Sequence, residues 1–240
     1  MRIGVVCEGQ TDYFAIEHFL GSYLRSLEME AKFIAIQPAM DNTKPVTGWS
    51  NVILWLVKNP PAARVINFFT GGLFGGEMAI EPFDAILIQM DTDILGDDGF
   101  NSFIEKVTGY VPKNPGDPPS RASEISKVVK LTAKFEELTE ADVRRHVVVP
   151  AVESTETWCV AAFNAKSDNF EFLRGIDLTN AFMKALEVSE GTQAKDVYEN
   201  INKDQKRRSE FCKRHAVGAS RIYKNCSSFS SACDCLHALK

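Results

Sequence analysis

The sequence predicts an α/β fold whose mostly parallel sheet is flanked by helices and followed by a helical C-terminal region. Three mostly apolar runs of strand length support this prediction, at residues 3–7, 85–90 and 145–149. Such short runs are typical of strands that are buried on both faces of a sheet. Segments with helical periodicity separate the runs, and the alternation of strands with helices favours parallel pairing.

The first part of the chain is expected to form a strand, a helix, a strand and a second helix. The run at 3–7 ends in Glu8-Gly9, which marks a turn, and Thr11 can cap the helix that follows. That helix carries a continuous apolar stripe, made by Ile16, Phe19, Leu20, Tyr23, Leu24 and Leu27. Residues 32–37 are the next strand candidate, and residues 49–57 form a helix that stops before an Asn-Pro-Pro sequence.

The later part of the chain begins with the clearest strand, at 85–90. A proline-rich loop is expected at 110–120, and Pro150 closes the strand at 145–149. The glycine-rich stretch at 71–76 lacks the Lys-Ser/Thr ending of a phosphate-binding P-loop, so it is interpreted as a plain loop. Helices are expected at 123–137, 155–163, 178–186, 204–216 and 229–239.

We therefore expect an α/β domain at residues 1–165 and a helical, basic region at 166–240 that packs on it. The 240 residues are 45% hydrophobic and 25% charged, as in ordinary globular proteins. No apolar run reaches about 18 residues, so no membrane span is expected. The six cysteines are widely spaced and no signal peptide is evident, which predicts reduced thiols in the cytoplasm.

The charge is distributed unevenly along the chain. Residues 203–240 hold nine basic against three acidic residues, although the whole chain has a net charge of -5. A basic tail on an acidic body is consistent with a phosphate-binding surface in one place and a metal centre in another. The equally weighted alternative is a solvated terminal helix.

Three acidic residues follow two of the predicted strands directly. Glu8 ends the first strand, Asp91 follows the strand at 85–90, and Asp93 lies two residues further on. In an extended chain, residues i and i+2 point the same way, so all three carboxylates can converge at one sheet edge and bind Mg²⁺. A calcium loop is rejected, because Leu95 and Ser102 occupy two of its ligand positions. The remaining alternative, that Asp91 only caps a turn, explains one carboxylate and not three.

Two short motifs at these positions resemble a known family. Glu8-Gly9-Gln10-Thr11-Asp12 resembles the first Toprim motif, and Asp91-Thr92-Asp93 resembles the second. Toprim domains occur in topoisomerases, bacterial primases, small RNA-maturing nucleases and nucleases of the overcoming-lysogenization-defect type. The resemblance covers about the first half of the chain. It implies Glu8 as a metal ligand or acid/base group, and Asp91 and Asp93 as ligands of Mg²⁺ or Mn²⁺.

The sequence departs from several Toprim branches. The gap from Glu8 to Asp91 is longer than in a minimal Toprim domain, which makes residues 62–80 a candidate insertion. The chain has no room for a separate topoisomerase region with its tyrosine, and it has no primase zinc ribbon. The small nuclease-like branch, which includes proteins associated with phage defence, is therefore the expected one.

A second resemblance concerns the segment after Pro150. Small Toprim-like proteins of bacterial defence neighbourhoods carry Pro and then Glu-x-Trp at a helix start, and Glu156-Thr157-Trp158 matches. It implies Glu156 as a ligand of a second metal, with Glu153 as a rival. The alternative is that Glu156 favours the helix dipole and Trp158 lies in the core. The resemblance also implies a late lysine, Lys195, that stabilises charge on the scissile phosphate; the favoured alternative is a plain surface lysine.

Other polar residues were weighed for binding roles. Asp97 and Asp98 are expected in a solvated loop, with extra metal ligation as the alternative. Cys226, Cys233, Cys235 and His237 lack the spacing of two CxxC pairs, so core-facing thiols are expected in place of a zinc site. The residues predicted to grip nucleic-acid phosphates are Lys206, Arg207, Arg208, Lys213 and Arg214.

The expected function is cleavage of DNA or RNA phosphodiesters by a nuclease that uses Mg²⁺ or Mn²⁺, with Glu8, Asp91, Asp93 and Lys195 as catalytic residues. Bacterial defence against phage is the expected setting, and a partner ATPase or another defence-system subunit is a candidate partner. The alternative is a non-catalytic subunit that keeps the Toprim fold to bind nucleic acid or to assemble a complex.

Overall fold

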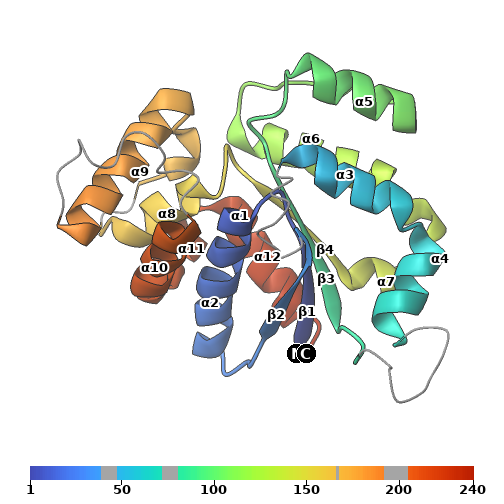
Figure 1. Cartoon of the computed structure of the whole chain (residues 1–240), viewed down its shortest axis with the longest axis horizontal. Helices are drawn as coiled ribbons and strands as arrows, with labels where there is room; N and C mark the ends of the chain where they lie inside the picture. Colours follow the sequence, from blue (N-terminus) through green and yellow to red (C-terminus); the bar gives the residue numbers. More distant parts are fainter. Residues whose placement is uncertain (39–47, 72–80, 166–167, 192–204) are drawn as a thin grey trace.

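The chain is an α/β protein with a four-stranded, entirely parallel sheet in the order β2-β1-β3-β4 (Figure 1). The computed structural model describes residues 1–38, 48–71, 81–165, 168–191 and 205–240. The strands are β1 (Arg2–Val6), β2 (Lys32–Gln37), β3 (Ala85–Asp91) and β4 (His146–Ala151). The predicted fold class and all four predicted strands are confirmed.

Helices cover both faces of this sheet. In the first half they are α1 (Gln10–Ala15), α2 (Gly21–Ser26), α3 (Trp49–Lys58), α4 (Pro61–Arg64) and α5 (Asp98–Thr108), with the π-helical segments η1 (Ile16–Leu20) and η2 (Val65–Phe69). In the second half they are α6 (Pro118–Thr132), α7 (Glu140–Arg144), α8 (Glu156–Phe163), α9 (Gly175–Glu190), α10 (Gln205–His215), α11 (Ala219–Asn225) and α12 (Ser227–His237). Because η1 joins α1 to α2, the predicted first helix is one continuous helical stretch.

The alternating side chains of the strands build two cores. One core lies under α1, α2 and the C-terminal helices, and it takes the side chains of Val5, Leu87 and Val149 from the sheet. The other lies under α3, α5 and α6 and takes Ile86 and Ile88. Figure 1 shows the blue α1 and α2 beside the red C-terminal helices on one side of the sheet, and the cyan α3 with the green α5 and α6 on the other.

The helical C-terminal region belongs to the first of these cores. Helix α12 packs on β4, and α10 packs on α1 and α8. Buried residues of both helices, among them Phe211 and Phe229, share one apolar cluster with the strands. No helix in the described ranges has both the length and the apolar character that a membrane crossing requires.

Several predicted element boundaries are wrong, and local interactions explain them. Gly9, not Thr11, occupies the position that precedes α1. The expected loop at 110–120 ends earlier, because the Asp117 side chain accepts a hydrogen bond from the Ser120 N–H at 3.0 Å and α6 begins at Pro118. The expected solvated loop around Asp97 and Asp98 is the start of α5, since the Asp97 side chain accepts the Phe100 N–H at 2.7 Å.

Candidate functional site

Glu8 and Asp91 meet at the carboxyl edge of the sheet. Their strands are neighbours, and the register pairs Val6 of β1 with Ile88 of β3. Glu8 therefore lies beside the end of β3, and its Oε1 accepts a hydrogen bond from the backbone N–H of Asp91 at 2.9 Å. Glu8 is only 8% exposed, so its carboxyl group is held within the protein.

Asp91 is the last residue of β3 and lies on the same face of that strand as Gln89. The Gln89 Nε2 donates to Asp91 Oδ1 at 2.6 Å, which fixes the orientation of the carboxylate. Gln89 is fully buried, and its Oε1 has no hydrogen-bond partner among the described residues. A buried hydrogen-bond acceptor without a partner lowers the stability of a folded protein, so burying Gln89 beside Asp91 has an energetic cost.

Asp93 lies at the same edge of the sheet, in a turn after β3. The expected extended geometry is wrong, because β3 ends at Asp91 and Asp93 lies in the turn that follows. Two hydrogen bonds join this turn to the segment after β4: the Asp93 N–H donates to the Glu153 carbonyl at 3.1 Å, and the Glu153 N–H donates to Thr92 Oγ1 at 2.8 Å. Asp93 is exposed at the rim of the site.

Asp12 is a fourth carboxylate of the site and was not among the predicted site residues. It lies in the first turn of α1 and is 7% exposed. Thr155 Oγ1, just before α8, donates to Asp12 Oδ1 at 2.6 Å. The residue stood within the first Toprim-like motif, and its position four residues after Glu8 was the available indication. We call Glu8, Asp12, Asp91 and Asp93 the acidic centre.

Two buried arginines flank the acidic centre, and each is paired with a glutamate. Arg121 of α6 donates to Glu153 Oε2 at 2.5 Å and to the Thr92 carbonyl at 2.7 Å. Arg208 of α10 forms an ion pair with Glu156. The proposed ligand Glu156 and its rival Glu153 are therefore both engaged by guanidinium groups.

The geometry leaves the acidic centre with excess negative charge. None of its four carboxylates forms an ion pair with any residue that the structure describes. Arg208 interacts electrostatically with Asp12 and Asp91, and Arg121 interacts with Asp93, but each arginine bonds to a glutamate instead. Buried like charges of this kind repel one another unless protons or a cation reduce the charge.

The protonation behaviour of the centre follows from this crowding. Burial, followed by the charge of Asp12, raises the pKa of Glu8 to about 8. Burial also raises the pKa of Asp91 well above its usual value, with further contributions from Asp12 and Glu8. The pKa of Asp12 is raised by burial, although the Thr155 hydrogen bond opposes the change. Although Asp93 is exposed at the rim, partial desolvation of its carboxyl group, followed by the charge of Glu153, raises its pKa to about 6.

The donor chemistry of the acidic centre suits a hard divalent cation. All four side chains offer carboxylate oxygens, which Mg²⁺ and Mn²⁺ prefer. Within the described ranges, however, no group of three or more His, Cys, Asp and Glu side chains is arranged to hold a metal ion by itself. Mg²⁺ commonly binds through one or two carboxylates and keeps several waters. An ion at this centre would therefore need water or substrate oxygens to complete its coordination.

The remaining predicted site residues are not part of the acidic centre. Lys195 lies outside the described residues. On α10, Lys206 and Lys213 are exposed, whereas Arg207 pairs with Glu190 at 3.0 Å and Arg214 bonds to the Ser189 carbonyl.

The prediction of Arg208 as a surface phosphate ligand is wrong. The residue is only 1% exposed, because α10 turns it inward toward Glu156. The cysteines near the C-terminus divide differently: Cys226 and Cys233 are buried, as expected of core thiols, and Cys235 is exposed.

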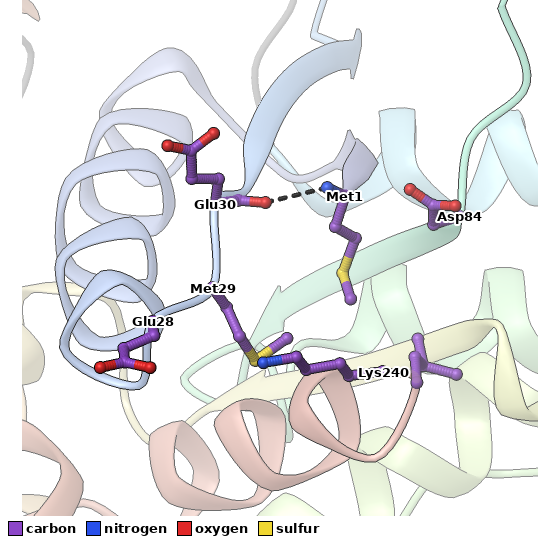
Figure 2. A pocket seen from close by; sticks show the side chains of 7 residues that line it. Met1, Glu28, Met29, Glu30, Asp84 and Lys240 are labelled. Carbon is purple, nitrogen blue, oxygen red and sulfur yellow. Dashed lines mark hydrogen bonds between the residues drawn. The ribbon is translucent and has the colours of Figure 1, made fainter.

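A separate pocket of about 480 Å³ lies at the opposite edge of the sheet (Figure 2). Its lining includes Met1, Met29, Asp84 and Lys240, and the Met1 ammonium group donates to the Glu30 carbonyl at 2.8 Å. This is the end where β1 and β3 begin. None of the predicted site residues that the structure describes lines the pocket, and the acidic centre lies at the other ends of the same strands.

Comparisons with known proteins add no assignment. No protein-family model, no curated protein and no solved structure matches the chain.

Proposed function

We propose that the chain is a Toprim-like nuclease that hydrolyses DNA or RNA phosphodiesters with the help of Mg²⁺ or Mn²⁺. The observation that carries the proposal is the acidic centre itself: four carboxylates without ion pairs among the described residues, gathered at the carboxyl edge of a parallel sheet. Open α/β sheets place their functional groups at this edge. The setting of bacterial defence against phage is part of the proposal and rests on the motif resemblance alone.

In this proposal, the side chains of the acidic centre and its neighbour Gln89 have different roles. Asp91 and Asp93 would hold the ion, which when bound polarises the phosphate and lowers the pKa of a bound water. Gln89 keeps the Asp91 carboxylate in its orientation through the 2.6 Å hydrogen bond. Glu8 would serve as the general acid or base, because its carboxyl group lies beside the ligand Asp91 and accepts the backbone N–H of that residue at 2.9 Å.

Asp91→Asn is the variant that tests this function. The amide keeps the size of the side chain and can still accept the Gln89 hydrogen bond, so we expect an intact fold. Mn²⁺-dependent cleavage of single-stranded DNA, duplex DNA and RNA should fall by about 10²-fold or more, because the variant loses an anionic ligand of the ion. Glu105→Gln, at an exposed position of α5, is the matched control and should cleave like the parent.

Two results of this experiment would reject the proposal. Cleavage by Asp91→Asn at the parental rate would place any activity elsewhere. Unfolding of the variant at a pH where the parent is folded would make Asp91 a structural residue. The melting temperature without metal, measured on the same samples, separates these two results.

One observation favours the alternative of a non-catalytic nucleic-acid-binding or assembly subunit. The described residues contain no side-chain group that is arranged to hold a metal ion by itself. Under this alternative, the isolated protein would bind nucleic acid without binding Mn²⁺. Its affinity for nucleic acid would also be unchanged by Asp91→Asn.

A further inference from the structure

Arg208 is the most completely enclosed cation near the acidic centre. Its guanidinium group pairs with Glu156, donates to Cys159 Sγ at 3.2 Å, and lies 4.4 Å from the centroid of the Phe182 ring. The side chain has no exposed surface. These contacts come from α8 and α9 and fix the charge of a C-terminal helix beside the sheet edge.

The position of the Arg208 charge affects how many divalent ions the acidic centre can bind. Arg208 interacts electrostatically with both Asp12 and Asp91, two of the four carboxylates that have no ion pair in the described part of the chain. A divalent ion bound by Asp91 and Glu156 would compete with the Arg208 guanidinium group for these two carboxylates. Like charges in a poorly solvated site repel strongly, so Arg208 disfavours an ion on its own side of the centre.

The ligands that a second ion would need are also engaged. Two-metal sites hold their ions about 3.5–4 Å apart and require carboxylates on both sides. On the β4 side the candidates are Glu156 and Glu153, and both are paired with buried arginines. The carboxylates of Glu8, Asp91 and Asp93 form no ion pair among the described residues, although Arg208 interacts electrostatically with Asp91 and Arg121 with Asp93.

We propose that Arg208 takes the place of a second cation, so that the acidic centre binds one divalent ion. This inference rests on the proposed function, because it assumes that the centre binds metal at all. Arg208 would then be a positioning residue, which keeps Glu156 from the metal and leaves the ion on the side of Glu8, Asp91 and Asp93.

The test is a Mn²⁺ titration of the full chain, with bound metal measured by calorimetry and by the loss of the free-ion electron paramagnetic resonance signal. The parent should bind one ion per chain. Arg208→Gln frees Glu156 and removes the repelling charge, so it should bind two ions. The double variant Arg208→Gln with Glu156→Gln should return to one ion, because the freed ligand is gone.

Two further variants serve as controls for this titration. Arg144→Gln is the matched control and should bind one ion. That arginine is exposed on α7, and within the described residues its ion pair is with Glu140 of the same helix. Asp91→Asn should bind Mn²⁺ at least about tenfold more weakly than the parent, as loss of a ligand or its support commonly does.

The outcomes separate this inference from the proposed function. No saturable Mn²⁺ binding by the parent would reject the metal centre itself. Two ions in the parent, with binding lost in Asp91→Asn, would overturn only the role of Arg208, and so would an unchanged single ion in Arg208→Gln. If Arg208→Gln does not fold, the parental stoichiometry decides: one ion supports the inference and two overturn it.

Discussion

Replacing Glu8 by Gln should stabilise the metal-free protein at pH 8. Glu8 is 8% exposed, and burial, followed by the charge of Asp12, raises the pKa of its carboxyl group from 4.5 to about 8. Folding therefore favours the protonated form. The glutamine keeps the size of the side chain and an oxygen that can accept the Asp91 N–H, which now lies 2.9 Å from Glu8 Oε1.

The magnitude follows from the linkage between protonation and folding. The folded state binds the proton more tightly than the unfolded chain, so stability falls as the pH rises from about 4.5 and the loss is complete above about 8. The two pKa values set an upper limit of about 5 kcal/mol. Neighbouring carboxyl groups can take up protons and share this penalty, so we expect a gain of about 1–3 kcal/mol for Glu8→Gln at pH 8.

The assay is urea unfolding at pH 5 and pH 8, with a chelator present. At pH 8 the variant should unfold at higher urea than the parent, and at pH 5 the two should nearly coincide. Glu105→Gln on α5 controls for the loss of one charge at an exposed position and should show no gain at pH 8. Equal stability of Glu8→Gln and Glu105→Gln at pH 8 would refute the claim that repulsion and burial destabilise the centre.

Two further predictions concern Arg121 beside the acidic centre and the basic helix α10. Arg121→Gln should lower the free energy of unfolding by about 3–5 kcal/mol, because it leaves Glu153 as a buried charge without its ion-pair partner. A loss under about 1 kcal/mol in a urea titration would contradict this. Reversing the charge of Lys206 and Lys213, which are exposed on α10, should weaken binding to all nucleic-acid sequences alike and reduce the salt dependence of that binding. Unchanged binding in a fluorescence-anisotropy salt series would show that the two lysines do not bind nucleic acid.

The four strands could be predicted because a strand is encoded by a local pattern of apolar residues. Five of residues 85–90 are apolar, the exception being Gln89, and all six are buried in β3. Because the strand ends could be predicted, so could the positions of Glu8 and Asp91 just beyond or at those ends. Parallel pairing of β1 with β3 then brings both residues to one edge of the sheet. Helix α5 could also have been predicted from local signals, because Asp97 caps its start and Gly109, in the left-handed conformation, ends it.

The partners of the acidic centre could not be predicted in the same way. Asp12 joins the centre only because α1 lies beside the segment that carries Thr155, which is 143 residues away in sequence. Arg208 stands in a run of basic residues that is typical of a solvated surface, and its burial depends on the packing of α10 against α1 and α8. Contacts of this range are set by tertiary packing and leave no periodic pattern in the sequence.

The most direct test of the metal centre is an anomalous difference map from a crystal soaked in Mn²⁺. We predict one peak per chain at the carboxyl edge of the sheet, within about 2.5 Å of an oxygen of Asp91 or Asp93. This peak should be absent from an identically soaked crystal of Asp91→Asn. A fully soaked parental crystal without a peak at the acidic centre, or with its peak elsewhere, would contradict a metal-binding role for Asp91 and Asp93.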